Sequence, residues 1–151
     1  VLEIAKELVD YSFIIVGEGT HRGVLENIIL RENIKNVELV GFKGAEILKK
    51  YYFESDCYLL TSFAEGTPTS MLEAMACGLP IVCSDAGGVK SILHNKNYVV
   101  ENNSKSMFIN CLSVLASNKK LRDDISEKNM INSKNYTWKN VAQNINKYFI
   151  N

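Results

Sequence analysis

The sequence predicts a single α/β domain built on a doubly wound parallel sheet of about five strands. Short apolar runs alternate with segments of helical periodicity, and strands separated by helices of about 8 to 14 residues are typical of βαβ units. The runs are apolar throughout, as strands covered on both faces require. A length of 151 residues suits one domain and does not accommodate a second of similar size. We therefore assign residues 1–151 to one domain.

The N-terminal half supplies three predicted strands. Residues 12–16 and 37–40 are short apolar runs that end at Gly17 and Gly41, and residues 57–60 form an unbroken apolar run. The segments before and between these runs have apolar residues at helical spacing, which predicts helices over 1–10, 21–34 and 45–53.

The C-terminal half begins with a helical pattern over residues 69–77, and Gly78 directly after it is a residue that commonly ends helices. Pro80 introduces a strand over 81–83, and Gly87-Gly88 marks a turn. The rest is predicted to form a short helix, a strand and three helices, over 89–93, 98–100, 104–117, 119–134 and 137–150.

This order of elements predicts a Rossmann-like fold followed by C-terminal helices. Such domains normally begin with a strand, whereas this sequence opens with a helical pattern, so we expect a first strand and its loop to precede it. Ligands of these folds bind at the carboxyl ends of the strands. Three segments should face that crevice: Gly17–Gly19, Gly41–Lys43 and Ser62–Ser70.

Composition excludes several classes of function. Seventeen Lys and Arg residues balance 17 Asp and Glu residues, which argues against a nucleic-acid partner. No apolar run approaches the roughly 20 residues of a membrane span, and no secretory signal opens the sequence. We expect a cytoplasmic protein, with peripheral membrane association left open for a longer polypeptide.

The cysteines and histidines give no sign of a metal site. Cys57, Cys77, Cys83 and Cys111 form no C-x-x-C pair and lie in or beside apolar segments, so we expect reduced, buried thiols, neither disulfides nor zinc ligands. We interpret His21 and His94 as surface residues.

The segment of residues 61–88 carries the chemistry. Its loop leads into a helix whose free N–H groups and positive dipole would suit a phosphate, with Gly66 allowing close approach and Thr69, Ser70 and Met71 presenting amides. Glu65 and Glu73 would repel phosphate, but carboxylates accept strong hydrogen bonds from sugar hydroxyls. The combination suggests a nucleotide sugar.

Two plainer interpretations stay open. Ser70-x-x-Glu73 is also a capping box, in which the glutamate bonds back to the serine amide. Glu65 alone could be a solvated loop residue.

The segment EGTPTSMLEAMACGLPIVCSDAGG resembles the signature of retaining glycosyltransferases of family 4, which have the GT-B fold. In that signature seven residues separate two glutamates, as they separate Glu65 from Glu73 here. The resemblance extends to Gly17-x-Gly19, to Gly41-Phe42 and to Tyr136-Thr-Trp138, and so covers nearly the whole chain.

The resemblance implies a role for each matched residue. Glu73 would bind the ribose and Glu65, the residue nearest to catalysis, a hydroxyl of the donor sugar. The backbone of Gly66, Thr67, Pro68 and Thr69 would face the sugar, and the amides of Ser70 and Met71 the diphosphate. Gly41 and Phe42 would lie near the base, and Gly17 and Gly19 near the phosphates.

The resemblance also implies what accompanies the chain. The donor would be a UDP-, GDP- or ADP-sugar, transferred with retention and without a metal cofactor, as in bacterial surface polysaccharide or glycolipid synthesis. The acceptor, a glycan or lipid-linked sugar, would bind a separate N-terminal domain, so this domain alone is expected to be inactive in transfer. The family's basic diphosphate clamp usually follows the expected first strand, and Val89-Lys90-Ser91 lacks the family's usual glutamate after the glycine pair.

Other classes fit the sequence less well. A GT-B sugar-nucleotide epimerase shares the fold but not ordinarily the paired glutamates. A dinucleotide-binding module would show G-x-G-x-x-G, whereas position 22 is Arg and Gly23 comes one residue late. A phosphoacceptor module would cluster aspartates at strand ends, where only Asp56 and Asp85 qualify loosely. A glycoside hydrolase also uses two carboxylates but holds them across a cleft.

Overall fold

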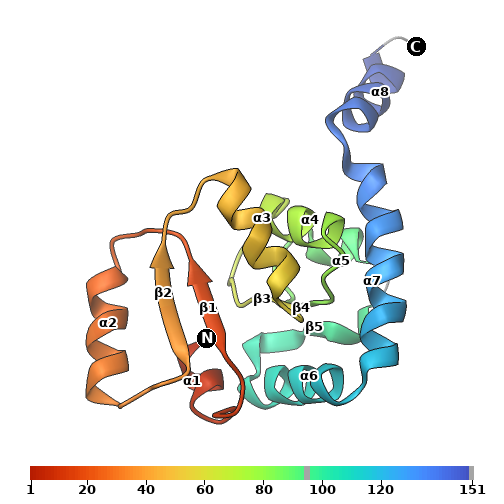
Figure 1. Ribbon diagram of the computed structural model, residues 1–151. Coiled ribbons are helices and arrows are strands. Elements are labelled where there is room, and N and C mark those ends of the chain that lie inside the picture. The colour runs from red at the N-terminus through yellow and green to blue at the C-terminus, as the bar shows by residue number, and fades with distance from the viewer. Residues whose placement is uncertain (94–95, 150–151) are drawn as a thin grey trace.

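The computed structural model describes residues 1–93 and 96–149, and it confirms an α/β domain in which every strand pair is parallel (Figure 1). The strands are β1 (Phe13–Val16), β2 (Val37–Gly41), β3 (Tyr58–Leu60), β4 (Ile81–Ser84) and β5 (Val99–Val100). The α-helices are α1 (Leu2–Ala5), α2 (Arg22–Arg31), α3 (Ala45–Glu54), α4 (Thr69–Ala76), α5 (Val89–Ile92), α6 (Lys105–Ser117), α7 (Lys119–Ser133) and α8 (Trp138–Phe149). Short 3₁₀ segments cover Lys96–Tyr98, Glu101–Asn103 and Lys134–Tyr136.

The expected single sheet is wrong, because the strands form two sheets. One has the order β1-β2 and the other β3-β4-β5. The reason lies in backbone pairing: β1 bonds to β2 and β3 bonds to β4, but β1 and β3 are not hydrogen-bonded to each other. The apolar composition that predicted a sheet does not specify which edges meet.

The two faces of the β3-β4-β5 sheet pack against different helices. Ile81 and Cys83 of β4 join a core with Met71 of α4 and Val89 of α5, whereas Val82 packs in a separate core with α6. Because successive residues of a strand point to opposite faces, α4 and α5 cover one face and α6 the other. Tyr52 of α3 belongs to the first core.

Helix α1 is much shorter than the predicted helix over residues 1–10. The side-chain amide nitrogen of Asn36 lies 2.9–3.0 Å from the carbonyl oxygens of Ala5, Leu8 and Tyr11. It thereby satisfies carbonyls that a continuing helix would have used. Helix α2 likewise ends at Arg31 rather than 34, because Asn33 adopts a left-handed conformation with φ of 53°.

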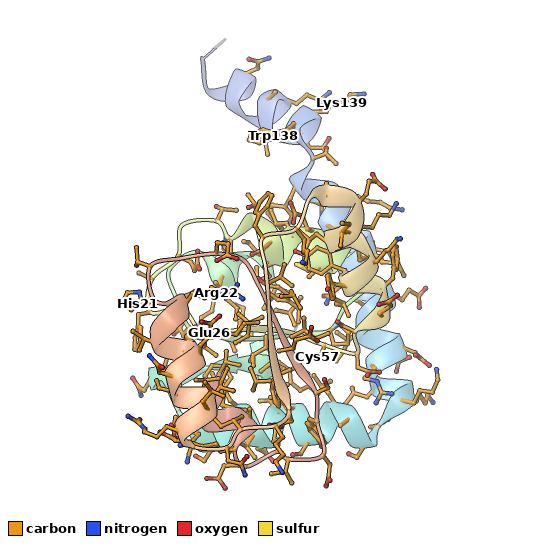
Figure 2. All side chains as sticks on the ribbon, turned by 60° about the vertical axis from the view of Figure 1, so that its left-hand side comes forward. His21, Arg22, Glu26, Cys57, Trp138 and Lys139 are labelled. Carbon is orange, nitrogen blue, oxygen red and sulfur yellow. The ribbon has the colours of Figure 1, made fainter. Side chains whose placement is uncertain are left out.

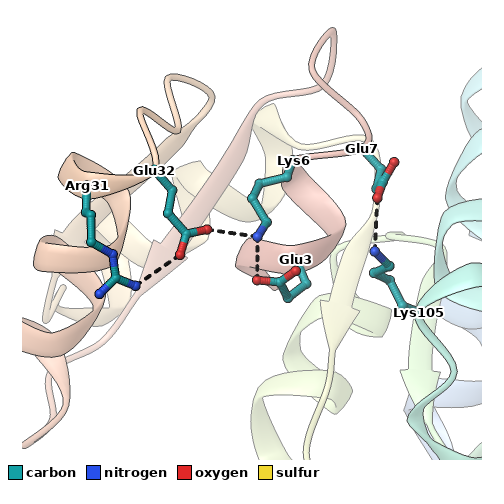
Figure 3. A network of polar contacts seen from close by, with 6 residues as sticks. All are labelled: Glu3, Lys6, Glu7, Arg31, Glu32 and Lys105. Carbon is teal, nitrogen blue, oxygen red and sulfur yellow. Dashed lines mark hydrogen bonds and ion pairs between the residues drawn. The ribbon is translucent and has the colours of Figure 1, made fainter.

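Helix α1 lies on the same face of the molecule as α2 and α6. Leu2 and Ala5 pack in one cluster with Ile34 and with residues of α2, and Ile4 packs with α6. Ion pairs join these helices at the surface, with Lys6 Nζ 2.8 Å from Glu32 Oε2 and Lys105 Nζ 2.9 Å from Glu7 Oε1 (Figure 3).

Two buried asparagines attach α7 to the sheet. Asn129 donates to the carbonyl of Leu79 at 2.8 Å, and Asn132 donates to that of Ile92 at 2.6 Å. The polar sequence of this segment is therefore helical, as predicted. Beyond it α8 extends away from the body, and Trp138 at its start is 87% exposed (Figures 1 and 2).

The expected thiol burial is confirmed for Cys83 and Cys111, whereas Cys57 and Cys77 are half-buried; all four are free. Burial raises the pKa of the Cys57 thiol to about 12. His21 is exposed, as expected, and His94 lies outside the described residues. No helix within the described residues is long and apolar enough to cross a membrane.

Candidate functional site

The loop between β3 and α4, together with the first turns of α4, contains most of the predicted site. Glu65 and Ser70 are half-buried, Gly66, Thr67, Thr69 and Glu73 are exposed, and Pro68 and Met71 are buried. This gradient leaves the two glutamates and the loop backbone accessible while Met71 anchors the helix in the core.

The N-terminus of α4 has no side-chain cap. Pro68 occupies the N-cap position, and it has no side-chain group that could accept a hydrogen bond. Met71 N–H donates to the Pro68 carbonyl at 3.1 Å, whereas the amides of Thr69 and Ser70 make no hydrogen bond within the described residues. These two free donors, at the positive end of the helix dipole, form a local anion-binding geometry.

Two tyrosines fix the side chains of this first turn. Tyr58 and Ser70 share a hydrogen bond of 2.7 Å between their hydroxyls, and Tyr52 donates to Glu73 Oε2 at 3.1 Å. The capping-box interpretation is therefore wrong: Ser70 is not the N-cap residue, and the described contact of Glu73 is with Tyr52. Burial, and then the nearby Glu73 charge, raise the pKa of Tyr52, so its hydroxyl stays a donor.

The turn after β4 holds the Glu65 loop from the other side. The buried Ser84 hydroxyl donates to the carbonyl of Ser62. Gly87 has a left-handed φ of 60°, and a Cβ there would overlap the carbonyl oxygen of Glu65. A Cβ at Gly88 would come within 2.5 Å of the Gly66 carbonyl oxygen. The glycine pair is thus a close-packed support for the loop and more than a plain connection.

A second group of predicted residues lies at the ends of β1 and β2. Gly17 N–H donates to the Gly41 carbonyl at 2.9 Å, while Gly19 and Phe42 are exposed. Gly41 has a φ of 74°, and a Cβ there would lie 2.5 Å from Glu18 Oε1.

Arg22 is occupied by neighbouring carboxylates at this end of the molecule. It forms ion pairs of 2.8 Å with Glu18 and with Glu26 (Figure 2). Within the described residues no hydrogen bond joins this group of loops to the Glu65 loop. The structure therefore arranges the predicted residues in two groups, one on each sheet.

A pocket of about 570 Å³ adjoins the Glu65 loop, lined by Phe63, Ser84, Asp85, Glu101, Asn102 and Asn103. Lys90 lies 2.6 Å from Asp85 Oδ2 and 3.5 Å from Glu101 Oε1, and its hydrogen bond to Asp85 raises its pKa. No sequence spacing predicted this pocket, nor the support that Tyr52, Tyr58 and Ser84 give. Among the described residues no group of three or more His, Cys, Asp or Glu side chains could hold a metal.

Comparison with known proteins follows the same boundaries. The family described as "Glycosyl transferases group 1" matches residues 1–130. An uncharacterized glycosyltransferase of Haemophilus influenzae is 32% identical over 137 residues, which are 88% of this chain and 38% of that protein. The chain spans less than half the length of the curated relatives it resembles.

Solved structures show the same fold. S. aureus TarM, crystallised with fondaparinux, α-GlcNAc-glycerol and UDP, superposes with a TM-score of 0.83 at 27% identity, over 94% of this chain and 30% of that one. Anabaena HepE, in complex with UDP and glucose, gives a TM-score of 0.82 at 19% identity, over 97% and 43% of the two chains. The fold is that of one Rossmann-like half of a GT-B protein.

Proposed function

The chain belongs to the glycosyl transferases group 1 family, and from this membership and the site geometry we propose that it is the donor-binding domain of a glycosyltransferase. The donor is a nucleoside diphosphate sugar. The observation that carries the proposal is the uncapped start of α4, where the free amides of Thr69 and Ser70 lie in sequence between Glu65 and Glu73.

Each group has a chemical task in this proposal. The diphosphate accepts hydrogen bonds from the free amides, since anions are stabilised at a helix N-terminus. Glu73, oriented by Tyr52, accepts hydrogen bonds from the ribose hydroxyls, and Glu65 accepts one from the transferred sugar. The relatives TarM and HepE were crystallised with UDP, which makes UDP-sugars the first donors to test.

Transfer proceeds with retention in this proposal, as in family 4. Developing charge on the leaving diphosphate is stabilised by the α4 dipole and by amides, so no metal ion is required. The acceptor binds to a second domain of a longer polypeptide, which also completes the enzyme. A role in surface polysaccharide or glycolipid synthesis, in the cytoplasm, fits this donor class.

The experiment that tests the proposal is calorimetric titration of the chain with UDP, GDP and ADP, with UMP as the control that lacks the second phosphate. We expect one diphosphate to bind more tightly than its monophosphate, because the α4 amides recognise the diphosphate. If no nucleoside diphosphate binds to the chain, or to the longer polypeptide its gene encodes, the proposal is wrong.

An epimerase acting on a nucleotide sugar would give the same binding result. The two functions separate on the product of the longer polypeptide: a transferase moves the sugar to an acceptor, whereas an epimerase returns an isomeric nucleotide sugar without one. Exclusive formation of the isomer would overturn the proposed transfer.

A further inference from the structure

The strands at the junction of the two sheets are less buried than their sequences require. All four residues of β1 (Phe-Ile-Ile-Val) and all three of β3 (Tyr-Leu-Leu) are apolar or aromatic, yet none is fully buried and Ile14 is 41% exposed. The four residues of β4, by contrast, are all buried. In Figure 1, β1 lies between β2 and the β3-β4-β5 sheet, and Phe13 packs in the same cluster as Leu59. Two apolar strand edges are thus unpaired on the sides where the sheets meet.

The backbone groups of these edges point into the junction. Phe13 N–H donates to Asn36 on the β2 side, and Tyr58 N–H donates to Pro80 on the β4 side. In parallel strands, the backbone groups of successive residues point to alternate sides. The N–H and C=O groups of Ile14 and Leu59 therefore face the junction, where neither sheet supplies a partner. Unpaired groups of this kind form a template for another strand.

The handedness of the connections indicates where the strand before α1 lies. Helix α2 connects β1 to β2, and α1 packs on the same face as α2. Crossovers between parallel strands are right-handed in nearly all proteins, so helices on one face move the chain in one direction across the sheet. A strand that precedes α1 must then lie on the side of β1 opposite to β2. That position is the junction with β3.

We propose that a strand of the same polypeptide, preceding α1, occupies the junction and pairs in parallel with both β1 and β3. The complete sheet then has the order β2-β1-strand-β3-β4-β5. Its occupant is an extended, mainly apolar segment, since it pairs on both edges and is covered by helices on both faces. This inference rests on the sheet edges and on α1, and does not depend on the proposed function.

The inserted strand has a consequence for the site. On one side of it the chain proceeds toward β2, and on the other toward β5, so the strand order reverses beside it. Ligand crevices of such sheets form at this reversal, outside the carboxyl ends of the strands. The loop that leaves the inserted strand therefore emerges between the Gly17–Gly19 loop and the Glu65 loop. It joins the two groups of site residues that the described residues leave unlinked.

The test is amide hydrogen exchange, measured by NMR, on the 1–151 chain and on the polypeptide its gene encodes through the sequence before Val1. In the 1–151 chain we expect Ile14 and Leu59 to exchange much faster than Phe13 and Tyr58, whose N–H groups already have partners. In the longer polypeptide all four should be similarly protected. Equal protection in the monomeric 1–151 chain, or continued fast exchange in the longer polypeptide, would overturn the proposal.

Two further results separate the possible occupants. Sedimentation of the 1–151 chain should show a monomer; a dimer in which Ile14 and Leu59 are protected would mean that a second copy fills the junction. A gene that encodes nothing before Val1 would also overturn the proposal.

A proline substitution gives an independent readout. Ile14→Pro removes an N–H that has a partner only in the longer polypeptide, so it should lower the melting temperature of that form more than that of the 1–151 chain. Phe13→Pro, which removes the N–H bonded to Asn36, should lower both. Equal losses for Ile14→Pro in the two forms would contradict the pairing.

Discussion

Gly87 lies so close to the backbone of Glu65 that a Cβ at position 87 would overlap the Glu65 carbonyl oxygen. Gly88 stands in a similar relation to the carbonyl oxygen of Gly66, at 2.5 Å from an ideal Cβ. The turn after β4 and the loop after β3 are therefore one packed unit. The position of Glu65 depends on a turn more than 20 residues later in the sequence.

Gly87→Ala should destabilise the domain and displace the Glu65 loop. The alanine would meet the Glu65 carbonyl and would also adopt a left-handed φ, which together cost on the order of 1–3 kcal/mol. Urea unfolding measures this loss, and amide chemical shifts of Glu65 and Gly66 report the displacement. Gly23→Ala is the matched control, because a Cβ in α2 meets nothing within 4 Å and favours the helix by up to about 1 kcal/mol. Equal stability of the two variants would contradict the packing described.

Stability should fall at alkaline pH because of Tyr52 and Tyr58. Burial raises the pKa of both phenols in the folded state, above the value of about 10 in the unfolded chain. Their contribution is thus fully present below pH 10 and is lost as pH rises from there toward the folded-state values. We expect the free energy of unfolding to decrease above about pH 10, and the Tyr52→Phe variant to show a smaller decrease. An identical pH dependence in that variant would exclude Tyr52 as the cause.

Asn132→Ala should destabilise the attachment of α7 to the body. The variant removes a buried donor and leaves the Ile92 carbonyl without it, at a cost of about 1–3 kcal/mol. Asn110→Ala, at an exposed position of α6, is the control and should change stability by less than about 0.5 kcal/mol. Chemical denaturation of both variants measures the difference, and a loss at Asn110 as large as that at Asn132 would contradict the role of burial.

Donor binding should not require a divalent metal. Because free amides at the start of α4 bind the diphosphate in the proposed complex, excess EDTA should leave the affinity for a nucleoside diphosphate unchanged. Calorimetry with EDTA, and then with added Mg²⁺ or Mn²⁺, measures this directly. Binding that disappears with EDTA and returns with Mn²⁺ would mean that a metal, and not α4 alone, holds the phosphates.

The sequence predicted those features that depend on neighbouring residues. Strand and helix periodicity located every described strand to within a few residues, and glycines at 17 and 41 correctly marked the ends of β1 and β2. The loop with Glu65 and the helix with Glu73 were predicted for the same reason, because a strand, a glycine-containing loop and a helix follow one another directly.

Features that depend on distant residues could not be predicted. Nothing near Ser70 in sequence shows that Tyr58 binds its hydroxyl, and a local pattern therefore suggested a capping box that the structure excludes. Asn36 ends α1 from beyond β1, and the split between the sheets depends on a pairing that β1 and β3 lack. In each case the deciding contact lies many residues away.

The most direct test of the central claim compares Glu73→Gln with Glu65→Gln in titrations with the nucleoside diphosphate and with its sugar. We expect Glu73→Gln to weaken both ligands by about 1–3 kcal/mol, the loss typical of a hydrogen bond to a charged group. Glu65→Gln should weaken only the sugar-bearing ligand. Equal effects of the two variants on both ligands, or no effect of Glu73→Gln on either, would contradict the assignment of ribose to Glu73 and sugar to Glu65.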